Sequence, residues 1–292
     1  MKLKKLPIWA LALAILAGSS CSQDDYNYAK DDAYGTLSFA LATDNLLNEG
    51  EISRAGERAG GQITISEALG GTNVFNASTF LSTNGGNFSI VVEDADEETI
   101  YNGPISGWSN DKPLAFGNYT VTATYDLRQV GFYGNGGQPA FESEEVSFAI
   151  ANADIPTEVT IPVVLSNSIM RVQYSDMFKK YYSSCEVTVT QNNSSVTFNY
   201  DETRGAFFET GRNATINYTL TPAQAQGDNS KVISKSISHT FAAKSCHTLQ
   251  FNVTNVGGVN KLTITLDDTT IQEVEIGDID LNDDQYQPND GE

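Results

Sequence analysis

Three side chains that commonly bind soft metal ions lie close together in the chain: His239, Cys246 and His247. Imidazole and thiolate groups are the usual zinc ligands, and a structural zinc site takes four of them, in spaced pairs such as C-x2-C. The sequence contains no such pair. Cys246 and His247 would also point to opposite faces of a strand, because side chains alternate along it. We therefore predict no metal site and no cofactor.

The sequence also contains no recognisable set of catalytic residues. It has no G-x-S-x-G nucleophile elbow, and only two histidines are available as bases. The paired acids Glu97–Glu98 and Glu144–Glu145 are direct neighbours. Neighbouring strand residues face opposite ways, so neither pair can flank a glycosidic bond at the separation that hydrolysis requires. We predict that the protein is not an enzyme.

Cys185 and Cys246 leave two alternatives open. Exported proteins meet an oxidising environment, so the two residues can form a disulfide, which would stabilise the fold by roughly 4 kcal/mol. They can equally remain two buried free thiols, because spacing in the sequence does not show that their Cα atoms approach.

The N-terminal segment has the pattern of an export signal. Lys2, Lys4 and Lys5 precede an apolar run from Ile8 to Ala17. This run is too short to span roughly 30 Å of hydrocarbon. Gly18, Ser19 and Ser20 then lead into Cys21, which resembles the relaxed lipobox of Bacteroidota lipoproteins. The resemblance implies a signal peptide over residues 1–20 and acyl chains such as palmitate on Cys21. An ordinary secretory signal with an incidental cysteine is the alternative.

An acidic tether over residues 21–34 follows the lipobox. It opens with Ser22, Gln23, Asp24 and Asp25, which resemble the signal that sends Bacteroidota lipoproteins to the outer face of the outer membrane. The chain after residue 20 holds 14 Lys and Arg against 37 Asp and Glu. So negative a surface repels nucleic acid and anionic lipid, which excludes nucleic acid as a partner. We expect a lipid-anchored protein exposed at the cell surface.

The rest of the chain has the pattern of an all-β protein. Short runs with a period of two are separated by turns rich in Gly and Asn, every 8–12 residues or so. Gly117 and Tyr119 open the longest run of the first half, as in a tyrosine corner, where the hydroxyl bonds to backbone a few residues upstream. The main predicted strands are Gly35–Thr43, Phe88–Val92, Leu114–Tyr125, Val146–Ile150, Val159–Leu165, Ile169–Tyr174, Cys185–Thr190, Ala214–Leu220, two within Ile237–Val253, and Lys261–Leu266.

The layout from GTLSFAL through LAFGNYTVTATY to KLTITLDD resembles the uncharacterised surface lipoproteins of Bacteroidota that are related to the fimbrillins. The resemblance implies two tandem β-sandwich domains of the Greek-key, transthyretin-like kind, which we assign to residues 35–165 and 166–281, with a disordered tail over 282–292. In pilus-forming relatives a protease cuts after an Arg in the N-terminal region. Arg54, followed by Ala55 in a predicted loop over residues 45–61, matches that position.

Two functions follow from this resemblance. In the first, the protein is an adhesion or assembly component: a cut at Arg54 frees the first strand, and a strand from another pilus or surface subunit takes its place. A plain loop at Arg54 is the alternative. In the second, the protein binds host or dietary glycans through aromatic rings, with Trp108, Phe132 and Tyr133 as the platform. Rings that pack back onto their own domain are the alternative.

Overall fold

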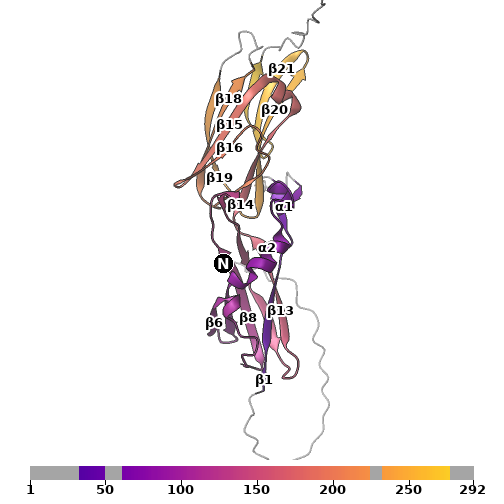
Figure 1. Cartoon of the computed structure of the whole chain (residues 1–292), viewed down its shortest axis with the longest axis vertical. Coiled ribbons are helices and arrows are strands. Elements are labelled where there is room, and N and C mark those ends of the chain that lie inside the picture. The colour runs from indigo at the N-terminus through magenta and orange to yellow at the C-terminus, as the bar shows by residue number, and fades with distance from the viewer. Residues whose placement is uncertain (1–32, 50–60, 224–231, 277–292) are drawn as a thin grey trace, which may run out of the picture.

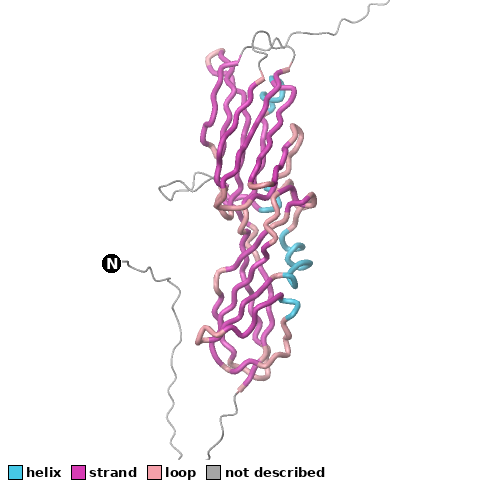
Figure 2. Tube along the Cα trace, turned by 90° about the vertical axis from the view of Figure 1, so that its left-hand side faces the viewer, coloured by secondary structure: helices cyan, strands magenta, loops and turns pink. Residues whose placement is uncertain are grey.

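The computed structural model describes residues 33–49, 61–223 and 232–276, and their backbone is mostly β-strand (Figure 1). Strands fill two stacked units, and short helices lie along one side near the junction (Figure 2). The predicted mostly-β architecture with several sheets is confirmed. The strands expected from the period of two appear within a few residues of their predicted bounds.

A seven-stranded sheet forms the unit that contains the first described residues (Figure 1). All its ladders are antiparallel except that of β2 with β13. Its order is β2 (Leu37–Ala42), β13 (Thr157–Leu165), β11 (Ala140–Ser143), β8 (Gly117–Asp126), β5 (Ser89–Asp94) and β6 (Thr99–Pro104), with β12 (Val146–Ile150) also paired to β8. Beside it, β1 (Tyr34–Gly35) pairs with β7 (Leu114–Ala115). The alternating burial of β8 shows which of its faces meets the core.

Short helices and aromatic rings pack against the buried face of this sheet. Thr64 and Glu67 form a capping box at α1 (Ile65–Ala68), and the Thr64 backbone hydrogen bond lowers the pKa of Glu67. The side chain of Asn76 caps α2 (Ala77–Asn84). Phe80 on α2 meets Tyr125 and Phe141 of the sheet, with ring centroids 5.3 and 5.7 Å apart. The 3-10 turns η1 (Gly85–Asn87) and η2 (Ile105–Gly107) complete this layer.

Two sheets face each other in the other unit. A four-stranded sheet runs β16 (Ser194–Phe198), β15 (Tyr182–Gln191), β18 (Asn213–Pro222) and β19 (Ile233–Thr240). It shares a hydrophobic cluster with the facing sheet, in which Tyr218 meets Phe251. The short helix α3 (Asp176–Tyr181) packs into the same cluster through Phe178. The facing nine-stranded sheet runs β10 (Gly136–Gly137), β9 (Gly131–Tyr133), β17 (Ala206–Phe208), β14 (Ser168–Tyr174), β20 (Ser245–Val256), β21 (Val259–Leu266) and β22 (Thr269–Ile276), with β3 (Leu46–Glu49) beside β20 and β4 (Gln62–Thr64) beside β3.

Strand pairing crosses the boundary predicted between residues 165 and 166. That boundary falls between β13 and β14, but β3, β4, β9 and β10 precede it and join the nine-stranded sheet. Backbone contact also links the units: the Gly205 amide donates to the Ala68 carbonyl at 3.1 Å. A Cβ on Gly205 would lie 2.3 Å from that oxygen, so only glycine permits this approach. The assignment of two domains stays a prediction.

One strand lies where the sequence predicts loop. We expected loop throughout residues 45–61, yet β3 occupies Leu46–Glu49 within that range. The strand has only four residues, too few for a period of two to stand out, and its partners β20 and β4 are distant or later in the chain. Pairing rather than local pattern therefore determines it.

Candidate functional site

The edge of β2 is the first part of the candidate site. β2 ends its sheet, with β13 as its partner among the described residues. The Thr157 amide donates to the Thr36 carbonyl at 2.8 Å, so Thr36 faces β13. Backbone groups of successive residues point to alternate sides of a strand. The backbone N–H and C=O groups of Leu37, Phe39 and Leu41 therefore point away from β13, toward the open edge of the sheet.

Trp108 caps the first of these three positions. Its indole Nε1 donates a hydrogen bond of 2.8 Å to the Leu37 carbonyl. The ring is held edge-on against Phe39 and Tyr101, with centroids 5.3 and 5.2 Å apart. An indole needs a partner for its N–H when buried, and an exposed strand edge needs blunting. The Trp108–Leu37 hydrogen bond gives the indole its partner and covers the strand edge at Leu37. Trp108 makes no such hydrogen bond to the backbone of Phe39 or Leu41.

A cavity of about 550 Å³, lined by apolar side chains and by the hydroxyl groups of residues such as Ser78 and Ser82, adjoins those two positions. Phe39 and Leu41 of β2 form one wall, and Leu81 on α2 and Ile105 on η2 contribute to the rest. Gly85 and Gly86 also line the cavity and add no side chain to it, and a Cβ on Gly85 would lie 3.6 Å from the Leu41 side chain. The arrangement offers main-chain hydrogen-bonding groups beside an apolar recess, which are the two requirements for binding an extended peptide.

The segment after β2 is anchored in the second unit. β3 runs parallel to β20, and the Asn48 amide donates to the Lys244 carbonyl at 2.9 Å. Arg171 on β14 donates to Glu49 at 2.7 Å and to Thr248 on β20 at 3.0 Å. Leu37 on β2 and Leu47 on β3 are both completely buried. One short N-terminal segment therefore supplies strands to both large sheets.

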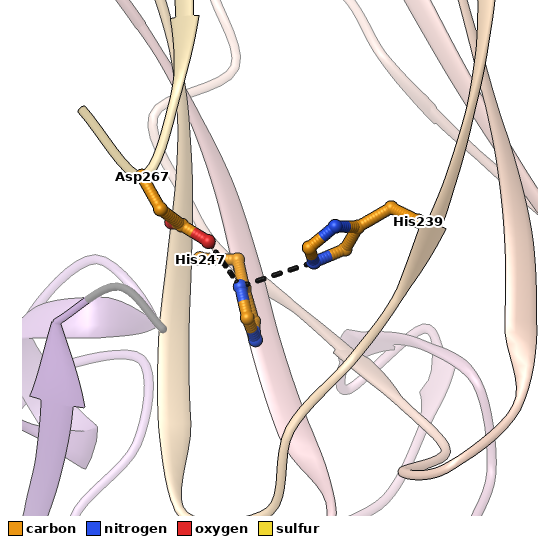
Figure 3. A group of neighbouring side chains, drawn as sticks. All are labelled: His239, His247 and Asp267. Carbon is orange, nitrogen blue, oxygen red and sulfur yellow. Dashed lines mark hydrogen bonds and ion pairs between the residues drawn. The ribbon is translucent and has the colours of Figure 1, made fainter. Parts of the chain in front are cut away.

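A second cluster brings two histidines and an aspartate together (Figure 3). His239 lies on β19, His247 on β20, and Asp267 in the turn between β21 and β22. His247 Nδ1 lies 2.5 Å from Asp267 Oδ2 and 3.2 Å from His239 Nε2. We discounted His239 and His247 because Cys246 could not join them. The missing third group is Asp267, and no local spacing links it to either histidine.

A family model described as a domain of unknown function, DUF4493, matches residues 64–283. The chain belongs to the DUF4493 family. A search of curated protein sequences found no match for this DUF4493 protein.

The DUF4493 chain is also similar to solved structures of surface proteins from Bacteroidetes. A fimbrial assembly protein from Parabacteroides distasonis has 11% identity and a TM-score of 0.37, over 80% of this chain and 98% of that one. The fimbrial anchor protein Mfa2 from Porphyromonas gingivalis has 10% identity and a TM-score of 0.31, over 82% and 100%. A protein from Bacteroides fragilis, described as a candidate cell adhesion protein, has 11% identity and a TM-score of 0.34, over 80% of this chain and 93% of that one. This is the kind of resemblance that the strand patterns predict.

The aromatic platform predicted for glycans does not form in the DUF4493 chain. Trp108 and Phe132 are each 8% exposed. Phe132 packs edge-on against Phe198, and Tyr133 packs edge-on against Phe75 with centroids 4.9 Å apart. Trp108 and Phe132 are packed into two different hydrophobic clusters, and Tyr133 is half-buried against one of them. Of the two alternatives, the structure therefore has the one in which these rings pack onto their own domain.

Both cysteines of the described region are buried free thiols. Cys185 lies in the cluster between the two facing sheets, whereas Cys246 lies in the cluster of the seven-stranded unit. Burial raises the pKa of each thiol to about 12. Of the two alternatives left open by the sequence, the structure has the free thiols. The same burial makes them poor nucleophiles at neutral pH.

The tyrosine corner is confirmed, and the remaining predicted positions fall outside the structure. The Tyr119 hydroxyl donates to the Ala115 carbonyl at 2.8 Å, four residues upstream. Cys21, Arg54 and Ala55 lie outside the described residues. Among helices of the described ranges, none combines the length and apolar character needed to cross a bilayer.

Proposed function

We propose that this DUF4493 protein is a non-enzymatic surface protein, delivered to the outer membrane by lipid on Cys21 and held there by that lipid until a protease cuts the chain, that works in adhesion or assembly by exchanging its N-terminal strand. The proposed exchange begins with a cut between Arg54 and Ala55. The freed segment leaves, and a strand from another surface subunit takes the position of β2. Two tandem β-sandwich domains would supply the scaffold, one for each hydrophobic cluster.

The observation that carries this proposal is the position of β2 at the end of its sheet. Among the described residues, β2 pairs through a single ladder, with β13, so its removal breaks no pairing between the other described strands. It leaves an apolar slot where the buried side chain of Leu37 was, next to the existing cavity. An uncovered slot of this kind favours refilling by another strand, because unpaired edges and apolar grooves otherwise aggregate.

The position of β3 supports the same exchange. β3 lies between β2 and Arg54 in the chain, and it pairs with β20 and β4 through three or fewer residues each. A cut at Arg54 would separate β3 from β4, which follows the cut. The segment 33–49 would then be held only by non-covalent contacts, which include its strand pairings, the buried Leu37 and Leu47, and the ion pairs Arg171–Glu49 and Lys244–Asp44.

The experiment compares Arg54→Ala with Arg58→Ala in cells that display the protein. Both substitutions remove one positive charge from the same predicted loop. N-terminal sequencing should find Ala55 as the first residue in wild type and in Arg58→Ala, and Cys21 in Arg54→Ala. High-mass assemblies that resist detergent should disappear in Arg54→Ala alone. If wild-type protein always begins at Cys21, strand exchange triggered by proteolysis is refuted.

One observation favours glycan binding as a second candidate function. A cleft of about 360 Å³ lies beside β14, lined by the rings of Tyr174 and Tyr200 and by polar groups that include Gln173, Asp201 and Gln250. Rings flanked by amides and carboxylates suit the apolar faces and hydroxyls of sugars. A glycan array probed with wild type, Tyr200→Ala and Phe116→Ala tests it. Phe116 is 40% exposed and lies outside the cleft, so its loss should change nothing.

A further inference from the structure

We propose that His239, His247 and Asp267 bind a divalent transition-metal ion of the zinc class, which links the two facing sheets. The three side chains come from three separate places in the chain, and their ligand atoms all lie within 4.8 Å of one another (Figure 3). His239 belongs to the four-stranded sheet. His247 belongs to the nine-stranded sheet, and Asp267 lies in the turn that joins β21 to β22 of that sheet. An ion between them would therefore bridge the sheets.

The spacing of the two imidazoles already fits a tetrahedral ion. Two nitrogens bound to zinc at 2.0–2.1 Å lie roughly 3.3 Å apart when the angle at the metal is tetrahedral. His239 Nε2 and His247 Nδ1 are 3.2 Å apart. Asp267 Oδ2 needs to move away from its 2.5 Å contact with His247 Nδ1 to admit the ion. Its other oxygen accepts the Thr248 amide at 2.9 Å, which orients the carboxylate toward the histidines.

The ligand types select the class of ion. Two imidazoles and one carboxylate suit Zn²⁺, Co²⁺, Ni²⁺ or Cu²⁺, whereas Ca²⁺ and Mg²⁺ prefer all-oxygen sites. His247 is fully buried and the Asp267 side chain is only 6% exposed, whereas His239 is partly exposed. Solvent therefore reaches the cluster from the side of His239, where a water molecule can complete the coordination of the ion.

Binding would change the protonation of His247. Its Nε2 accepts a hydrogen bond of 3.2 Å from the Ala242 amide, so the neutral ring carries its proton on Nδ1, facing Asp267 and His239. When an ion binds Nδ1, the neutral ring must carry its proton on Nε2 instead. Nε2 can then no longer accept from the Ala242 amide, so this hydrogen bond breaks. Metal binding is therefore coupled to a shift of the turn between β19 and β20. The protein loses one hydrogen bond and gains three metal–ligand bonds.

A metal link between the two sheets would stabilise β19, because of the position of β19 in its sheet. β19 is the edge strand of its sheet, and along its whole length residues alternate between half-buried and exposed, with none fully buried. An edge strand with so little buried surface is expected to be held less firmly than the inner strands β15 and β18 of its sheet. A metal ion on His239 would fasten its end to the opposite sheet.

The experiment titrates the purified mature protein with Co²⁺ and Zn²⁺, with Ca²⁺ as the comparison ion. We expect visible Co²⁺ absorption typical of a tetrahedral site, displaced by Zn²⁺, and a rise in Tm with Zn²⁺ but not with Ca²⁺. Hydrogen exchange at the Ala242 amide should become faster on binding. Asp267→Asn and His239→Ala should each weaken Zn²⁺ binding roughly 10-fold or more.

Asp268→Asn is the matched control for Asp267→Asn. Asp268 occupies the same turn with φ of 64°, close to the 49° of Asp267, and asparagine tolerates this left-handed conformation at both. Asp268 is exposed and lies outside the cluster, so its variant should bind Zn²⁺ like wild type. Unchanged Zn²⁺ affinity in both Asp267→Asn and His239→Ala would overturn the proposal, and so would equal losses in Asp267→Asn and Asp268→Asn.

Discussion

The Trp108 indole and the Leu37 carbonyl, 71 residues apart in sequence, form a buried hydrogen bond of 2.8 Å. Trp108 therefore acts as a cap on the edge strand β2. Replacement by Phe keeps most of the apolar ring but leaves the Leu37 oxygen without this donor. We expect Trp108→Phe to lower the free energy of unfolding by about 1–3 kcal/mol in urea titrations.

The control for that change is Tyr101→Phe. Tyr101 packs against Trp108, but its hydroxyl donates to the Pro104 carbonyl at an exposed site. We expect Tyr101→Phe to lower the free energy of unfolding by no more than about 0.5 kcal/mol. Equal effects of the two substitutions would mean that the buried hydrogen bond to Leu37 stabilises the fold no more than the exposed one to Pro104.

The buried side chain of Leu37 should contribute more to stability than that of Leu41. Both lie on β2 and alternate toward the same face, but Leu37 is completely buried whereas Leu41 is half-buried beside the cavity. Leu37→Ala should cost about 2–5 kcal/mol, and Leu41→Ala clearly less. Chemical denaturation of both variants measures the difference. Similar losses would show that the cavity wall at Leu41 is packed as tightly as the core.

The two buried thiols make stability depend on pH above 9. Burial raises the pKa of Cys185 and of Cys246 from an ordinary value of 9.0 to about 12. The folded state therefore keeps protons that the unfolded state loses. This contribution is complete below pH 9 and is lost as pH rises from 9 toward 12. Between pH 8 and 10 we expect a loss of about 1 kcal/mol per thiol.

A Cys185→Ala/Cys246→Ala variant isolates that effect. Buried tyrosines such as Tyr182 also have a pKa raised by burial, to about 12, but from 10.0, so they act mainly above pH 10. The unfolding free energy of the variant, measured by urea titration, should fall clearly less than that of wild type between pH 8 and 10, and the remaining fall should come mainly from the tyrosines as pH approaches 10. A slope as steep as that of wild type would show that other groups are responsible.

The ion pair between Arg171 and Glu49 should hold β3 in place. Its atoms are 2.7 Å apart, and the Arg171 side chain is 17% exposed. Glu49→Gln removes the charge partner of a mostly buried guanidinium, for which we expect a cost of about 1–2 kcal/mol and faster hydrogen exchange at the β3 amides. Hydrogen exchange with mass spectrometry provides the measurement.

Asp44→Asn serves as the comparison for Glu49→Gln. It removes one partner of the Lys244–Asp44 pair, which also joins the N-terminal segment to the second unit at 2.9 Å but is much more exposed. Solvent screening should keep its cost within about 1 kcal/mol. An Asp44→Asn effect on β3 exchange as large as that of Glu49→Gln would contradict the role assigned to burial.

The sequence by itself determined the local features of this protein. Strands such as β8 and β13 carry an alternation long enough to be recognised, because the period of two is a property of the backbone. The Tyr119 corner was predictable for the same reason, since its partner Ala115 lies only four residues away.

Only the tertiary structure decided which distant residues meet. It turned Trp108 inward to cap Leu37, placed β3 beside β20, separated Cys185 from Cys246, and brought Asp267 to the two histidines. Each of these depends on which strands become neighbours and which surfaces are buried. Such pairings result from the packing of the whole chain, and the residues around each position carry no local trace of them.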